Sequence, residues 1–248
     1  MNQTRLMMGM PITVEIADAP VTDEAFNAVF DYFQYVDEKF STYKETSEIM
    51  QINRQELSLE DASDDMKLIF ALADQTYHET YGYFDIRHKG MIDPSGVVKG
   101  WAIYNAAVLL QHMGYHNFYV DAGGDVQAVG KNNQGRYWRV GIRNPFNAHE
   151  IVKIVSVTNC GVATSGTYIR GQHIYDPKNG ADTIDDILSL TVIGPNIYEA
   201  DRFATAAFAM GKSGIAFIEN LNDFEGYAID ANGVATLTTD FKRYVYHD

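Results

Sequence analysis

Asp201 and Thr205 are the two side chains whose types and spacing point most directly to chemistry. They lie in residues 199–211, EADRFATAAFAMG, an alanine-rich stretch that predicts a helix closed by Gly211. A carboxylate and a hydroxyl four residues apart leave the same face of a helix, one turn from each other. Such a pair can share one hard cation, and Mg²⁺ prefers oxygen ligands while using only one or two carboxylates. The same spacing also suits a plain buried helix in which Thr205 bonds back to the carbonyl four residues earlier.

Residues 93–102, DPSGVVKGWA, predict a loop that turns into the start of another helix. Pro94 and Gly96 suit the loop. The first turn of a helix offers unpaired backbone N–H groups and the positive end of the helix dipole, which together form a natural anion site. Lys99, one turn further on, could reach a phosphate bound there. Asp93 could equally be a simple N-cap.

Two further segments carry groups that could act on a ligand, and each has a structural alternative. His173 lies in residues 165–180, SGTYIRGQHIYDPKNG, between a flexible glycine and a turn. A histidine so placed could take a proton from a hydroxyl or from water at neutral pH, or it could simply be bonded to a neighbour. Residues 121–125, DAGGD, predict a tight turn between strands. Its glycines could allow a ligand to come close, or they could merely build the turn.

Composition limits the partners and the chemistry of this chain. A net charge of −14 over 248 residues argues against nucleic acid and anionic membrane as partners, because a phosphate backbone is held by lysine and arginine. A phosphorylated ligand that arrives with a metal is still compatible, since the cation brings its own charge. Cys160 is the only cysteine, which excludes an internal disulfide, a thiolate zinc site and an iron–sulfur cluster.

The N-terminus has no apolar run of signal-peptide length, and no segment approaches the ~20 apolar residues of a membrane span. We therefore expect no membrane span and a cytoplasmic location for the chain as given. An exported form with its leader removed stays open as an alternative.

The rest of the chain predicts the elements that must position these groups. Helices are predicted to start at residue 22, near residue 63, after Gly96, at residue 199 and at residue 212. Strands are predicted at residues 12–16, 117–121, 125–129, 137–142, 151–157, 187–193, 225–230 and 234–238. Helices and strands mix without strict βαβ alternation. The predicted fold class is therefore α+β, a single compact domain over residues 1–248 with a mixed β-sheet core and flanking helices.

Together these segments resemble the ApbE family, the FAD:protein FMN transferases. The resemblance runs through nearly the whole chain in the family's order. It includes Met8-Gly9, residues 40–43 (FSTY) and residues 82–85 (GYFD). It continues through DPSGVVKGWA, VDAGGDV, WRVGIRNP, ATSGTY, HIYDPKNG and EADRFATAAFAMG. Each piece is modest, but the ordered set is highly specific.

The resemblance implies an α+β protein that binds FAD in a cleft, with Mg²⁺ at the pyrophosphate. Such enzymes move FMN from FAD onto a threonine or serine of an acceptor flavoprotein and release AMP. The resemblance implies as magnesium ligands Asp201, Thr205 and the carbonyl of Gly96. It implies as residues of the flavin cleft Met8, Tyr43, Tyr83, Phe84, Asp85, Asp93, Lys99 and Ile174. His173 matches the histidine that activates the acceptor hydroxyl.

Two alternative functions remain open at this point. In an FAD pyrophosphatase, water would replace the acceptor hydroxyl and give FMN and AMP. In a non-catalytic flavin-binding protein, the same cleft would bind without turnover. The chain also departs from the family pattern. Its segment between Arg87 and Asp93 is short, Asn179 stands where the family often has threonine, and no lipid-attachment cysteine precedes the domain.

Overall fold

A single large antiparallel sheet forms the centre of the computed structural model, which describes residues 1–166, 174–180 and 183–247. The strand order in the sheet is β1-β2-β5-β6-β9-β10-β11-β12. These strands are β1 (Asn2–Met7), β2 (Met10–Ile16), β5 (Phe118–Ala122), β6 (Asp125–Val129), β9 (Cys160–Gly166), β10 (Ile187–Gly194), β11 (Glu225–Asp230) and β12 (Ala235–Leu237). Two hairpins lie outside the sheet, namely β3 (Arg87–His88) with β4 (Met91–Ile92), and β7 (Trp138–Asn144) with β8 (Asn147–Val157).

The helices begin where the sequence supplies an N-cap or a loop residue. Thr22, Ser63 and Asn196 each accept a hydrogen bond from a backbone N–H three residues later, which satisfies an otherwise unpaired donor of the first turn. The helices are α1 (Asp23–Phe40), α2 (Glu48–Asn53), α3 (Asp64–Glu79), α4 (Ser95–His112), α5 (Ile197–Ala209) and α6 (Gly214–Glu219), with short 3₁₀ turns η1 (Gly211–Ser213) and η2 (Phe241–Tyr244).

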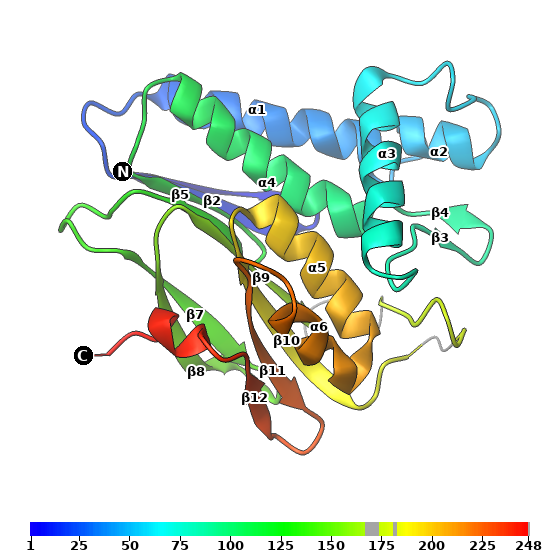
Figure 1. Ribbon diagram of the computed structural model, residues 1–248. Coiled ribbons are helices and arrows are strands. Elements are labelled where there is room, and N and C mark those ends of the chain that lie inside the picture. The colour runs from blue at the N-terminus through cyan, green and yellow to red at the C-terminus, as the bar shows by residue number, and fades with distance from the viewer. Residues whose placement is uncertain (167–173, 181–182, 248) are drawn as a thin grey trace.

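Both faces of the sheet are covered, and each cover buries its own apolar core. Helices α1, α4, α5 and α6 lie over one face, and the β7–β8 hairpin with η2 lies over the other (Figure 1). Ile12, Val14 and Ile16 point to the helical side, while Val162 and Ile229 point to the hairpin side. The central strands are therefore covered on both faces, so every residue of β6 and nearly every residue of β10 is buried.

The α+β class is confirmed, and one detail of the expected sheet needs correction. We predicted a mixed sheet, but every strand pair described in it is antiparallel. Tight turns join β1 to β2 and β5 to β6, and a tight turn reverses the chain direction. The longer connections, such as the helical segment between β2 and β5, also return the chain in the opposite direction. None of the helices in the described ranges is both long and apolar enough to cross a membrane.

Candidate active site

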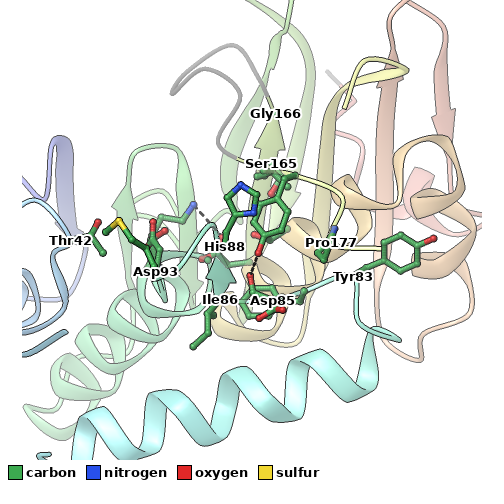
Figure 2. Close-up of a pocket in the computed structure, with 18 of the residues that line it drawn as sticks. Thr42, Tyr83, Asp85, Ile86, His88, Asp93, Ser165, Gly166 and Pro177 are labelled. Atoms are coloured by element: carbon green, nitrogen blue, oxygen red, sulfur yellow. Dashed lines mark hydrogen bonds and ion pairs between the residues drawn. The ribbon is translucent and has the colours of Figure 1, made fainter. Parts of the chain in front are cut away.

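A cavity of about 410 Å³ opens where the β3–β4 hairpin, the start of α4, the end of β9 and α5 meet. This size is within the usual range of ligand pockets. Figure 2 shows Thr42 and Asp93 on one side of it, Pro177 and Tyr83 on the other, and His88 between them. The predicted site residues that line the cavity are Tyr83, Phe84, Asp85, Asp93, Gly96, Lys99, Ile174, Asp201 and Thr205.

Three predicted residues are not placed in this cavity by the structure. Tyr43 is 97 % exposed, because its turn, in which the N–H of Tyr43 bonds to Ser41 Oγ, directs the ring into solvent. Its neighbour Thr42 lines the cavity instead. Met8 sits in the turn between β1 and β2, where its apolar side chain packs against the helix-side core. His173 lies outside the described residues, so its predicted role is not tested.

Lys99, Asp125 and Asp201 form a buried charge cluster at one wall of the cavity. The ammonium of Lys99 pairs with Asp125 Oδ2, and it lies 3.2 Å from Asp201 Oδ1. The other oxygen of each carboxylate accepts a hydrogen bond from the backbone. For Asp125 the donor is Thr164 N at 2.9 Å, and for Asp201 it is Gly100 N at 2.8 Å. The positions of both carboxylates are therefore fixed by the backbone of neighbouring elements.

The burial of Asp201 raises its pKa above that of an ordinary aspartate. Only 2 % of the residue is exposed, and loss of water disfavours the charged form. The nearby ammonium of Lys99 lowers the pKa, and the carboxylate of Asp125 raises it. The cluster thus has two carboxylates and one ammonium, so its net negative charge suits a cation.

Close contact between α4 and α5 is what brings Asp201 to this wall. A Cβ on Gly100 would lie 2.7 Å from Asp201 Cβ and 2.9 Å from the carbonyl oxygen of Ile197, so only glycine fits between the helices. The rotation of α5 is fixed from its other side by Arg202. Its guanidinium pairs with Glu79 of α3 and, at 2.5 Å, with Glu199. Asp201 therefore faces α4 while Arg202 faces α3.

Gly96, Thr205 and Asp201 offer a set of oxygen donors that fits Mg²⁺. A Cβ on Gly96 would lie 3.4 Å from Thr205 Cγ2, so the first turn of α4 and the Thr205 side chain are in contact distance. One carboxylate, one hydroxyl and one carbonyl are hard ligands that leave room for phosphate oxygens. Within the described ranges, no three histidine, cysteine or acidic side chains cluster as a metal site. The donor set does not resemble a zinc centre.

An aromatic wall of the cavity was only partly foreseen. The His88 ring stacks on Tyr175 at 3.7 Å between centroids. Tyr175 Oη donates to the carbonyl of Asp85 at 2.8 Å and to that of Arg87 at 3.1 Å. This ties residues 174–180 to the β3–β4 hairpin. Nothing in the spacing of His88 indicated this contact, whereas Tyr175 directly follows Ile174, which we had predicted.

The contacts of Asp93 and Asp125 differ from those that the sequence predicted. Pro94 is the N-cap of α4 and makes no side-chain cap bond. Asp93 Oδ1 instead accepts from Ser95 N at 3.0 Å, which fixes the loop before the helix. Asp125 was noted only as part of a turn. Its pairing with Lys99 joins β6 to α4, a contact that no local sequence pattern reveals.

Comparison with known proteins agrees with this geometry. A model of the ApbE family matches residues 8–92 and 86–228. The chain belongs to the ApbE family. The two matched stretches overlap at the β3–β4 hairpin, which is where the sequence showed a short segment between Arg87 and Asp93.

Curated relatives match over part of their length. A Haemophilus influenzae protein named FAD:protein FMN transferase is 29 % identical over 165 residues, covering 61 % of this chain and 48 % of the relative. A Vibrio cholerae protein of the same name is 32 % identical over 138 residues, covering 52 % and 41 %. The chain spans about half the length of the curated relatives it matches, or less.

Solved structures of other ApbE proteins share the whole fold. The flavin transferase ApbE from Vibrio cholerae superposes with a TM-score of 0.86 at 22 % identity, covering 98 % of both chains. The ApbE protein from Thermotoga maritima gives a TM-score of 0.86 at 21 % identity, covering 100 % of this chain and 99 % of the other. At these identities the likeness shows the fold.

Proposed function

We propose that this ApbE-family chain is a magnesium-dependent FAD:protein FMN transferase. It moves FMN from FAD onto a serine or threonine hydroxyl of an acceptor flavoprotein and releases AMP. The observation that carries the proposal is the pairing of a buried charge cluster (Lys99, Asp125, Asp201) with an aromatic wall in one cavity of about 410 Å³. FAD has the matching chemistry, since a pyrophosphate joins its two flat ring systems. The names of the matched relatives support the same activity.

The proposed reaction is a displacement at phosphorus. The acceptor oxygen forms a bond to the phosphorus of the FMN half, the bond from that phosphorus to the bridging oxygen breaks, and AMP leaves with the bridging oxygen. The hydroxyl proton passes to a base, and we assign that role to His173 from its sequence position. Such a reaction needs negative charge to be offset and the reacting groups to be aligned.

Several described residues supply those needs. The ammonium of Lys99 lies at the cavity wall and can bind phosphate oxygens, and the N-terminal end of α4 at Ser95 and Gly96 favours an anion through its dipole. Asp201, Thr205 and the Gly96 carbonyl are the residues that would hold Mg²⁺. When bound, Mg²⁺ would offset charge on the pyrophosphate oxygens. The stacked His88 and Tyr175 rings offer a flat aromatic surface for a ring system of FAD.

The test separates three activities by where the FMN goes. The protein is incubated with FAD, Mg²⁺ and an acceptor flavoprotein, and AMP, free FMN and protein-bound FMN are measured together. Transfer predicts AMP in step with protein-bound FMN. AMP in step with free FMN would identify an FAD pyrophosphatase. Binding of FAD without AMP release would leave a flavin-binding protein and overturn the proposal.

A further inference from the structure

The charge cluster contains one lysine and two almost fully buried carboxylates. Asp125 and Asp201 are 3 % and 2 % exposed, and the Lys99 side chain is 20 % exposed. Lys99 contacts one oxygen of each carboxylate, and backbone N–H groups occupy the other oxygens. Buried charges are costly unless they are paired, so Lys99 stabilises both carboxylates at once.

A cation held by Asp201 would compete with Lys99 for the same carboxylate. Asp201 Oδ2 already accepts the Gly100 N–H, which favours Oδ1, the oxygen 3.2 Å from Lys99 Nζ, as the metal ligand. Two positive charges on one carboxylate oxygen repel each other strongly in a buried site. Lys99 must therefore release or share Asp201 when the metal binds.

Asp125 gives the displaced ammonium a fixed place to stay. It lies on β6, whereas the three proposed metal donors lie on α4 and α5. The N–H of Thr164 on β9 holds its second oxygen. Gly123, two residues earlier in the β5–β6 turn, lines the cavity as Lys99 does. An ammonium retained by Asp125 thus remains at the cavity wall, within reach of a phosphate.

We propose that Lys99 is the internal counter-ion of Asp201 in the metal-free protein, and that Asp125 is the positioning residue that keeps Lys99 at the cavity when a divalent cation takes Asp201. This inference rests on the magnesium site of the proposed function. It adds a role for Asp125, and it makes Lys99 a competitor of the metal as well as a partner of the phosphate.

The test is a double-mutant cycle read out by calorimetric titration of Mg²⁺ into the FAD-free protein, near neutral pH. Lys99→Met removes the competitor, so Mg²⁺ affinity should rise by about tenfold or more, the equivalent of ~1.4 kcal/mol or more. Asp125→Asn keeps the acceptor for Thr164 N but removes the carboxylate charge that holds Lys99 away from Asp201. Mg²⁺ affinity should then fall by about tenfold. Lys131→Met, on an exposed lysine, makes the same change in net charge as Lys99→Met and should leave the affinity unchanged.

The coupling between the two substitutions distinguishes competition of Lys99 with the metal for Asp201 from a general electrostatic effect of the changed net charge. In the Lys99→Met background there is no lysine to retain, so Asp125→Asn should lower Mg²⁺ affinity only about twofold to threefold. Independent effects would instead add, as they do for uncoupled sites. An additive cycle in a protein that binds Mg²⁺ overturns this inference alone. A wild-type protein that binds no Mg²⁺ overturns the proposed metal site and the inference with it.

Stability measurements keep the test decisive if a variant folds poorly. Lys99→Met leaves two buried carboxylates without their cation, so its thermal midpoint should drop without Mg²⁺ and recover more than that of the wild type when Mg²⁺ is added. Lys99→Gln, which can still hydrogen-bond Asp125, should show the same directions with smaller changes. A midpoint that responds to Mg²⁺ equally in wild type and in both Lys99 variants contradicts the competition.

Discussion

Asp201 is the residue on which most of the site's electrostatics depends. It is buried, accepts the Gly100 N–H at 2.8 Å and faces Lys99. Asp201→Asn keeps the size of the side chain and an acceptor for Gly100 N, but removes the charge that a cation needs. We expect Mg²⁺-dependent AMP release to fall by at least ~10²-fold, because a hard divalent cation depends on its carboxylate ligand. Circular dichroism should show a folded protein.

Asp18→Asn is the matched control for that loss. Asp18 is also fixed by backbone N–H groups, those of His116 and Asn117, but it is not among the residues that line the cavity. This variant should lose some stability and keep its Mg²⁺-dependent turnover. Undiminished turnover of Asp201→Asn at limiting Mg²⁺ would place the metal elsewhere.

His173 is predicted to act on the rate of the chemical step more than on binding. A general base typically contributes ~10²–10⁴-fold in rate, so His173→Ala should lose about that much transfer activity. Affinity for FAD should change little, since Lys99 and the metal donors face the phosphates. Single-turnover transfer and an FAD titration on the same variant measure the two quantities separately. Equal loss of binding and rate would make His173 a ligand contact.

At the scale of residues, the sequence predicted which residues form the site better than it predicted which of them are in contact. Gly96, Lys99, Asp201 and Thr205 come from two separate motifs, and the structure places them around one cavity. Asp125 was visible only as part of a glycine-rich turn. Its partner Lys99 lies on a different element, and such a contact depends on how α4 packs against β6, which no local pattern encodes.

The geometry of the site depends on the contact between helices α4 and α5. Gly100→Ala would place a methyl group 2.7 Å from Asp201 Cβ and 2.9 Å from the Ile197 carbonyl oxygen. Alanine gains ~1 kcal/mol in helix propensity over glycine, but overpacking typically costs ~1–3 kcal/mol and here the clash includes backbone. We expect a net destabilisation of about 2 kcal/mol by urea unfolding, together with weaker Mg²⁺ binding.

Gly141→Ala tests whether that effect is specific to the helix contact. The three atoms nearest its added methyl all belong to the Ile151 side chain, and the closest is the terminal Cδ1 at 2.9 Å. A terminal methyl can rotate away, so this variant should be destabilised by less than about 1 kcal/mol. Equal stability of Gly100→Ala and the wild type would mean that α4 and α5 can separate without cost.

Strand β5 contains a half-buried carboxylate, Asp121, which makes folding pH-dependent. Burial raises the pKa of Asp121 to about 6, against its ordinary value of 3.8. A raised pKa means that the folded state binds the proton more tightly, so this stability is present below pH ~4 and is lost as the pH rises through ~6. Asp121→Asn keeps an acceptor for the Gly124 N–H. It should be ~1–3 kcal/mol more stable than the wild type above pH ~7 and similar below pH ~4. Urea unfolding at both pH values checks this, and a gain of equal size at both would assign the effect to something other than ionisation.

Elements with strong periodicity or clear boundaries were predicted well, and elements of small or mixed residues were not. Strands β6 (Asp125–Val129) and β11 (Glu225–Asp230) were predicted at the residues where they occur, and Ser63 was placed at the start of α3. Strand β9 (Cys160–Gly166) was missed because its small residues carry little strand propensity. It forms because β6 and β10 pair with it on both sides.

For the whole molecule, family membership and fold agree with the order of motifs in the sequence. The net charge of −14 makes the protein a poor match for an anionic ligand unless a cation accompanies it. That charge balance fits a cavity in which buried carboxylates outnumber the neighbouring lysine. Sequence reasoning could reach the fold class from the mixture of elements, but not the antiparallel order of the sheet, which is decided by long-range pairing.

The most direct test of the transferase assignment is the intact mass of an acceptor flavoprotein after incubation with this protein, FAD and Mg²⁺. We predict that the acceptor gains the mass of one FMN group, linked through a phosphoester, with one AMP released per labelled acceptor. Replacement of the acceptor's serine or threonine by alanine should abolish the gain, as should Asp201→Asn in the enzyme. An unmodified acceptor alongside FAD that is consumed to free FMN and AMP, or FAD that is not consumed at all, would contradict the account.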